Sequence, residues 1–332
     1  VREFEEAVER RLDVPHAIAI SSCTSGLMLG ARALGLRGEV IMPPFTWTST
    51  GLAMLWQNIT PVFADVLDGT YTLDPAAFEA AITPETTAVM PVTVFGVPPN
   101  IAEIEAIARR HDLKVFYDSA QALGSTYKGV PIGGFGDLEV FSMSPTKVAT
   151  AMEGGILTTR NDELATLLRR MRDYGKADDG DIDICGLSAR QTEFHGVVAK
   201  HTLAHLDEYV AARAGIAARY RAALESLVGV GFQTQPSDRT TSWNYFTMFI
   251  DGGKLGRDEL QAALLERGIQ TKRYFYPSLH EQTIYSHLRE RSVGKLPVAE
   301  RASGQGLALP LFSHMSSAQV ERVIDAVRSL MT

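Results

Sequence analysis

The sequence has little cysteine and no excess of positive charge. Cys23 and Cys185 are its only cysteines among 332 residues, and they form no Cys-x-x-Cys motif. With at most one cysteine pair the chain has no disulfide framework, which indicates a reducing compartment, and we expect the protein to be cytoplasmic. The net charge is −7, and no basic run occurs that would bind a polyanion. This balance excludes a dedicated nucleic-acid-binding protein, so we expect no nucleic-acid partner.

Long apolar runs are also missing. No run approaches the ~20 residues that a membrane-spanning helix needs, and the first residues lack the pattern of a signal peptide, so we expect no membrane span. Hydrophobic residues nevertheless make up 45% of the chain and charged residues only 21%. A chain of this length and composition is ample for a large core and favours two subdomains over one.

The first half of the sequence alternates short apolar runs with segments of helical periodicity. Strand patterns occur at residues 17–21, 40–42, 61–64, 88–95 and 114–117, and helical patterns separate them. Such alternation predicts parallel strands joined by right-handed crossovers, which gives an α/β sheet covered by helices.

The pattern changes after a long helical stretch at residues 192–224. Beyond it we expect strands at residues 243–250 and, in extended form, at 271–275, mixed with short helices. The chain is therefore predicted to divide into a large α/β domain over residues 1–225 and a small C-terminal α+β domain over residues 226–332.

Two strand ends carry the strongest chemical signal. The strand at residues 114–117 runs into Asp118, and a strand at residues 138–142 is followed by Lys147 within the sequence FSMSPTK. Because parallel strands end at the same edge of a sheet, we expect the two side chains to face one site. An amine that attacks an aldehyde and a carboxylate that keeps a ring nitrogen protonated favour pyridoxal 5′-phosphate (PLP) as cofactor. The alternatives are a structural lysine and a helix-capping aspartate.

Further residues near strand ends have the chemistry to hold such a cofactor. The backbone N–H groups of Thr24 and Ser25 open a helix and could bind a phosphate, and Ser142 could add a hydroxyl. Trp47 could stack on an aromatic ring, and Gln121 could donate a hydrogen bond to a ring hydroxyl oxygen. The alternatives are that the Ser/Thr residues are ordinary helix caps, that Trp47 is a core residue, and that Gln121 is solvated.

Three histidines lie on one helical segment. They are His195, His201 and His205. No cluster of carboxylates accompanies them to complete a set of metal ligands, so we expect no metal site.

Taken together, these motifs resemble those of the DegT/StrS-type sugar aminotransferases, PLP enzymes with the aspartate-aminotransferase fold (fold type I). The resemblance runs over nearly the whole chain and is carried, in this order, by SSCTSG, PPFTWTST, PVFADV, AAITPETTAVMPVTVFG, YDSAQALGSTYKG, FSMSPTK, EGGILTT, GLSARQTEFHGVVA and YFYPSLH. It implies a large PLP-binding domain with a mostly parallel, seven-stranded sheet covered by helices, and a smaller C-terminal α+β domain.

The resemblance implies a role for each candidate residue. Lys147 occupies the position of the Schiff-base lysine, and Asp118 that of the partner of the pyridinium nitrogen. The other cofactor-binding positions fall on Gln121 near the ring hydroxyl, on Trp47 at the ring face, and on Thr24, Ser25 and Ser142 around the phosphate.

Three features depart from the family pattern. Cys23 stands where glycine is usual, which stiffens the phosphate turn. Ser188 stands where the family has an asparagine that reaches the PLP phosphate of the partner subunit, and serine is shorter. The family also carries a further N-terminal segment that helps to close the substrate site, and the sequence here begins just after it.

The resemblance also implies a reaction and its partners. It predicts a homodimer with shared active sites that moves an amino group from an amino acid, usually L-glutamate, to a keto-sugar nucleotide in amino-sugar biosynthesis for antibiotics or polysaccharides. Arg273 and His280 would lie near the substrate; on sequence alone Arg273 also fits a solvated surface charge. The alternatives are an aminotransferase with a keto-cyclitol as acceptor, a PLP-dependent sugar dehydratase or lyase on the same scaffold, and a non-catalytic PLP-binding regulator. Retention of Lys147 argues against the dehydratase branch, where histidine replaces this lysine.

Overall fold

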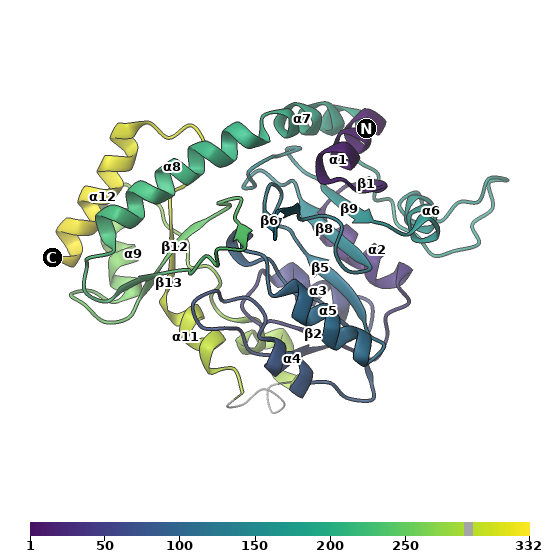
Figure 1. Cartoon of the computed structure of the whole chain (residues 1–332), viewed down its shortest axis with the longest axis horizontal. Coiled ribbons are helices and arrows are strands. Elements are labelled where there is room, and N and C mark those ends of the chain that lie inside the picture. The colour runs from purple at the N-terminus through teal and green to yellow at the C-terminus, as the bar shows by residue number, and fades with distance from the viewer. Residues whose placement is uncertain (289–294) are drawn as a thin grey trace.

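A seven-stranded sheet forms the centre of the larger lobe in the computed structural model, which describes residues 1–288 and 295–332 (Figure 1). Strand β9 runs antiparallel to both of its neighbours, and all the other pairs are parallel. In sheet order the strands are β1 (His16–Ile20), β9 (Gly155–Thr159), β8 (Leu138–Ser142), β5 (Lys114–Asp118), β4 (Thr86–Val89), β2 (Glu39–Met42) and β3 (Thr60–Phe63). The prediction of a mostly parallel seven-stranded sheet is confirmed.

Helices cover both faces of this sheet. In β1, Ala17 and Ala19 pack into one apolar cluster, while Ile18 and Ile20 pack into another, as the alternation of side chains along a strand requires. Both faces are therefore buried, which explains the continuous apolar runs in the sequence. One cluster contains side chains of α2 (Cys23–Ala33), α3 (Thr48–Leu55) and α6 (Asp162–Met171). The other contains side chains of α1 (Arg2–Leu12), α4 (Pro75–Ala80), α5 (Ile101–Arg110) and α7 (Glu193–Ala204).

Helix α2 lies unusually close to the sheet because glycines face it. A Cβ atom on Gly26 would lie 2.2 Å from Cδ1 of Ile20, and one on Gly30 would lie 2.5 Å from Cζ of Phe116. The hydroxyl of Ser22 accepts a hydrogen bond from the backbone N–H of Ser25 at 3.0 Å and fixes the start of the helix. The N-terminus of α2 is thereby held at the carboxyl edge of the sheet.

The smaller lobe has its own core. Its sheet consists of β10 (Val230–Phe232), β12 (Phe246–Ile250) and β13 (Gly306–Leu309), and its helices are α8 (Leu206–Leu224), α9 (Arg257–Glu266) and α12 (Ser317–Met331). Helix α8 runs from the end of α7 to α12 (Figure 1), and its side chains enter cores at both ends. The division of the chain after residue 225 stays a prediction.

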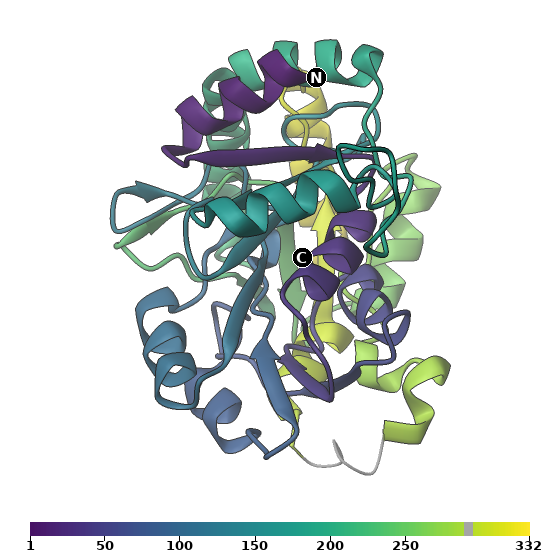
Figure 2. The same cartoon turned by 90° about the vertical axis from the view of Figure 1, so that its right-hand side faces the viewer.

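The remaining elements are short. A third sheet contains β6 (Thr126–Tyr127), β7 (Val130–Pro131) and β11 (Arg239–Thr240), and the other short elements are η1 (Val94–Gly96), η2 (Leu279–Glu281), η3 (Thr283–Leu288) and α11 (Pro297–Gln305). Figure 2 shows α1 beside α7 at one end of the molecule, where an ion pair joins Lys200 to Glu3. Within the described ranges, no helix is long and apolar enough to cross a membrane.

Three strand predictions need correction. The strand expected at residues 88–95 ends at Val89, and the chain turns into η1, where Phe95 has a φ of 58°. The strand expected from residue 243 begins at Phe246, because Trp243 has a φ of 55°. Residues 271–275 form no strand: Lys272 makes a single bridge to the β13 residue Ala308, and the chain then turns.

Candidate active site

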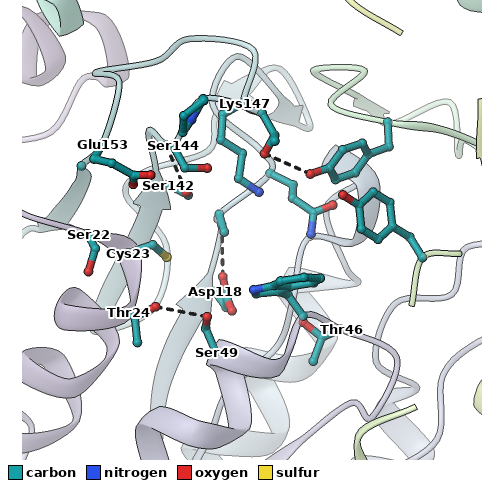
Figure 3. Close-up of a pocket in the computed structure, with 18 of the residues that line it drawn as sticks. Ser22, Cys23, Thr24, Thr46, Ser49, Asp118, Ser142, Ser144, Lys147 and Glu153 are labelled. Atoms are coloured by element: carbon teal, nitrogen blue, oxygen red, sulfur yellow. Dashed lines mark hydrogen bonds between the residues drawn. The ribbon is translucent and has the colours of Figure 1, made fainter. Parts of the chain in front are cut away.

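A cavity of about 370 Å³ lies at the carboxyl edge of the large sheet. Its wall combines the ends of β5 and β8, the N-terminus of α2, the segment before α3, and residues from the smaller lobe. In Figure 3, Lys147 and Asp118 reach into the same space, with Ser22, Thr24 and Ser49 along one side. The two residues singled out at the strand ends therefore meet in one cavity.

Asp118 ends β5 at the bottom of this cavity. It is 4% exposed; Oδ2 accepts a hydrogen bond from the hydroxyl of Thr50 at 2.7 Å, and Oδ1 accepts one from the backbone N–H of Ala120 at 3.2 Å. Burial raises the pKa of Asp118, and the hydrogen bonds and the nearby Lys147 ammonium oppose this rise. A buried carboxylate with few charged partners favours a cationic ligand beside it.

Lys147 lies in the loop after β8, on the opposite side of the cavity. It is half-buried, and its backbone N–H donates to the carbonyl oxygen of Ser144 at 3.1 Å. Its Nζ lies 5.7 Å from the ring centroid of Tyr245, within the range of a cation–π contact. Among the described residues that line the cavity, Lys147 is the only amine.

The end of the cavity at the N-terminus of α2 is rich in hydroxyl groups and backbone donors. Thr24, at the start of α2, donates from its hydroxyl to Oγ of Ser49 at 3.1 Å, and Ser142 ends β8 beside them. The backbone N–H groups at a helix N-terminus attract an anion, so this end suits a phosphate. Ser25 does not line the cavity, because its hydroxyl and its N–H take part in the capping box with Ser22.

Gln121 and Trp47 both line the cavity. Gln121 is 4% exposed and its Oε1 accepts a hydrogen bond from the backbone N–H of Phe95 at 2.9 Å, which leaves its Nε2 as the donor. The Trp47 side chain is 55% exposed, and its ring stands edge-on to that of Tyr274 at 6.2 Å. Trp47 is therefore a wall of the cavity and not a core residue.

Two tyrosines from the smaller lobe complete the cavity, and the sequence analysis missed both. Tyr245 donates its hydroxyl hydrogen to Oγ1 of Thr146 at 3.3 Å, and its ring lies 4.5 Å from that of Tyr274. Burial on its own would raise the pKa of Tyr245, but the Lys147 ammonium and three hydrogen bonds lower it on balance. Arg213 of α8 donates to the carbonyl oxygen of Asn244 at 3.1 Å and so helps to position the neighbouring tyrosine.

Other missed residues belong to motifs that the sequence did contain. Ser49 and Thr50 lie within PPFTWTST, in the first turn of α3, and Glu153 lies in the turn before β9. The helical period after Trp47 is the signal that points Thr50 toward Asp118. No local pattern identifies Tyr245 or Tyr274, because their position depends on how the smaller lobe packs.

The two expected substrate residues lie in different places. Arg273 lines a second cavity that adjoins the first, whereas His280 lines neither. His280 is 5% exposed, and its Nε2 lies 3.1 Å from Oε1 of Glu300 in α11. That segment is fixed by the backbone N–H of Leu279, which donates to the carbonyl oxygen of Pro44 at 3.0 Å. The structure thus brings only Arg273 near the candidate site.

Ser188 and the helical histidines lie outside the cavity. Ser188 is exposed and pairs with Asp173 through an isolated bridge, so its expected role at a partner subunit stays a prediction. The rings of His201 and His205 lie 4.6 Å apart. Within the described part of the chain, no group of three or more potential ligands is placed to hold a metal ion.

Comparison with known proteins identifies the family. The sequence matches the DegT/DnrJ/EryC1/StrS aminotransferase family over residues 1–328. The chain belongs to this family. A DegT/DnrJ/EryC1/StrS aminotransferase is a PLP-dependent transaminase.

Named relatives share about a third of their residues with this aminotransferase. One is the UDP-N-acetyl-3-dehydro-alpha-D-glucosamine 3-aminotransferase of Acidithiobacillus ferrooxidans, which is 34% identical over 98% of this chain and 87% of the relative. Another is the dTDP-3-amino-3,4,6-trideoxy-alpha-D-glucose transaminase of Streptomyces venezuelae, which is 34% identical over 98% of this chain and 85% of the relative.

Solved structures of the family have the same fold. The crystal structure of DesI in the presence of its TDP-sugar product superimposes with a TM-score of 0.93 at 35% identity, over 99% of this chain and 84% of that one. A DegT/DnrJ/EryC1/StrS aminotransferase from Brucella abortus superimposes with a TM-score of 0.92 at 30% identity, over 99% and 90% of the two chains. The predicted fold class is confirmed.

Proposed function

We propose that this aminotransferase uses PLP to move an amino group from an amino acid, L-glutamate, to a keto-sugar nucleotide in amino-sugar biosynthesis. The observation that carries the proposal is the pairing of Lys147 and Asp118 in one cavity that also contains the N-terminus of α2. Relatives named for UDP-, dTDP- and GDP-linked sugars support the class of acceptor.

The residues of the cavity fit PLP. Asp118 would hold a proton on the ring nitrogen, since its raised pKa reflects a buried carboxylate that a cationic neighbour would stabilise. Thr24, Ser142 and the backbone donors of α2 would bind the phosphate, and Nε2 of Gln121 would donate to the ring hydroxyl. When bound, PLP supplies an aldehyde that receives the amino group and a ring that withdraws electrons from the reacting carbon.

Lys147 would attach the cofactor and then carry protons. It is the one amine on the described wall of the cavity, so we assign it both tasks. The Tyr245 ring, 5.7 Å from Nζ, would stabilise the ammonium form whenever the lysine holds a proton. The hydroxyl of Tyr245 is occupied by Thr146, so the ring face is what it offers to the lysine.

Retention of this lysine weighs against a sugar dehydratase, whereas the chemistry of the cavity fits both a keto-sugar nucleotide and a keto-cyclitol as acceptor. A keto-cyclitol presents the same kind of ketone to the cavity as a keto-sugar does. A screen of keto-sugar nucleotides and keto-cyclitols with L-glutamate, read by the formation of 2-oxoglutarate, separates the two acceptors from each other and from a lyase.

Trapping the cofactor tests the proposal directly. The purified protein should be yellow, and reduction with borohydride should fix the cofactor on a peptide that contains Lys147. Lys147→Ala should abolish both labelling and transamination while PLP still binds without a covalent bond, and exposed Lys254→Ala serves as the matched control that should label normally. Label on any other lysine would contradict the assignment.

A further inference from the structure

The cofactor cavity is poorly equipped to bind an anionic substrate. Among the described residues that line it, Lys147 is the only cation, and it is committed to the chemistry. The same wall carries two carboxylates, Asp118 and Glu153, which repel the carboxylates of an amino-acid donor. The cavity of about 370 Å³ is also near the lower end of the volumes of ligand sites, so it has little space for a nucleotide besides a cofactor and a sugar ring.

A second cavity adjoins the first and has the opposite charge. It measures about 550 Å³ and shares Trp47 and Tyr274 with the cofactor cavity as a common wall. Lys272 and Arg273 line it, and none of its described lining residues is acidic. A substrate that reacts beside Lys147 can therefore extend past the rings of Trp47 and Tyr274 into the second cavity. The positive charge of that cavity attracts the negative groups of the substrate.

The cations and a hydroxyl of the second cavity have few partners in the described structure. The Lys272 side chain makes no ion pair or hydrogen bond with any described residue. Arg273 forms an ion pair with Asp258 through Nη1 at 3.6 Å, whereas Arg257 holds the same carboxylate more closely, at 2.6 Å. Thr271 is only 9% exposed, and its hydroxyl has no hydrogen-bond partner in the described part of the chain, although it lines the cavity.

We propose that this second cavity is one anion subsite used in turn by both substrates. Lys272 and Arg273 bind a carboxylate of the amino donor in one half-reaction and the phosphates of the acceptor in the other. The inference rests on the proposed function, because the donor and the acceptor of a transaminase react one after the other in the same cavity. The guanidinium of Arg273 stacks on Tyr276 at 5.0 Å, and apart from the 3.6 Å ion pair of Nη1 with Asp258 its N–H groups can pair with carboxylate or phosphate oxygens.

Competition between two simple probes tests whether the subsite is shared. The PLP-loaded protein is mixed with L-glutamate alone, and the loss of visible absorbance of the cofactor reports the donor half-reaction. Inorganic pyrophosphate should slow this half-reaction competitively, and its own binding is measured by calorimetry. Lys272→Ala and Arg273→Ala should each weaken both ligands by about tenfold, the loss typical of one charge-assisted hydrogen bond.

Control variants separate this effect from a general loss of charge. Lys254→Ala removes an exposed lysine from the same lobe and should change neither ligand, and Arg273→Lys should restore part of the binding lost in Arg273→Ala. Pyrophosphate that binds without competing with glutamate, or variants that weaken only one ligand, would overturn the shared subsite. If both ligands weaken but the screen finds no keto-sugar nucleotide that is aminated, the subsite stands and the proposed acceptor fails.

Discussion

At the scale of single residues, Asp118 has the clearest energetic role. Burial disfavours its charge, and the hydroxyl of Thr50, the N–H of Ala120 and the Lys147 ammonium compensate only in part. A protonated ring nitrogen would pair with this charge and draw electrons from the reacting carbon. The cost of burying Asp118 is thus offset when the cofactor binds.

We expect Asp118→Asn to keep the fold but to lose about a thousandfold or more in kcat, which is ~4 kcal/mol of transition-state stabilisation. The amide fills the same space but cannot hold the ring proton by charge. Single-turnover kinetics with L-glutamate measure the loss, and Thr50→Val, which keeps the carboxylate, is the matched control with a smaller effect. Near-normal activity in Asp118→Asn would favour a capping role at residues 118–120.

The sequence alone could identify the residues that directly follow strands or open helices. Lys147, Asp118 and Ser142 were found because a strand ends beside each of them, and the structure places all three on one cavity. His280 lies within a motif that suggested a substrate contact, yet the structure turns it toward Glu300. Tyr245 could not be found, since it reaches the cavity only through the packing of the smaller lobe.

At the scale of secondary-structure elements, a buried carboxylate ties β8 to a neighbouring loop. Glu139 is 1% exposed and accepts hydrogen bonds from the hydroxyl of Ser119 at 2.7 Å and from the backbone N–H groups of Gly133 and Phe135 at 2.9 and 2.8 Å. Burial raises the pKa of Glu139 to about 7 despite these bonds. The loop therefore depends on a side chain that changes its charge near neutral pH.

This linkage predicts how stability depends on pH. The pKa of Glu139 is higher in the folded protein than in the unfolded chain, so between about pH 4.5 and 7 the folded state binds more protons and loses stability as pH rises, by about 3 kcal/mol in total. Glu139→Gln has no charge to gain and should lack this loss: its amide oxygen can accept from the N–H groups of Gly133 and Phe135, and its amide nitrogen can donate to the hydroxyl of Ser119. Urea unfolding at pH 5 and pH 7.5 compares the two proteins, and an identical pH dependence in both would contradict the assignment.

The elements predicted best were those whose two faces are both buried. Strand β8 was placed at its observed bounds, because an apolar run followed by polar residues has one clear end. The segment 271–275 has an equally extended pattern, but β13 offers it only one bridge, at Lys272. Whether an extended segment becomes a strand depends on a neighbouring edge, and the local sequence does not contain that information.

At the scale of the whole molecule, several large apolar side chains remain on the surface. Phe194 and Val197 of α7 are 66% and 68% exposed, and Met152, next to the Glu153 turn, is 49% exposed. Exposed apolar groups of this size are typical of an interface. They support the expected homodimer, in which the exposed Ser188 would face the phosphate of the partner subunit's cofactor.

We expect light scattering to give the mass of a dimer, and Ser188→Asn to bind PLP more tightly by ~1 kcal/mol, about fivefold in Kd, because the longer side chain adds one hydrogen bond. Titration of the cofactor-free protein with PLP measures the change. Ser188→Ala, which adds no donor, is the control and should not bind more tightly. A monomeric protein with unaltered affinity in Ser188→Asn would rule out a contact across subunits.

Helix α8 has a consequence for recombining this enzyme with its relatives. Its first turn places Leu206 in the core of the larger lobe, and its last turns place Tyr220 and Leu224 in the core of the smaller one. In a chimera whose sequence changes from one parent enzyme to the other at residue 225, the last turns of α8 would come from the first parent. They would then pack into a core of the smaller lobe that comes from the second parent. Chimeras built to exchange acceptor preference should instead cross over between residues 210 and 216, so that the core of the smaller lobe receives all of its side chains from one parent.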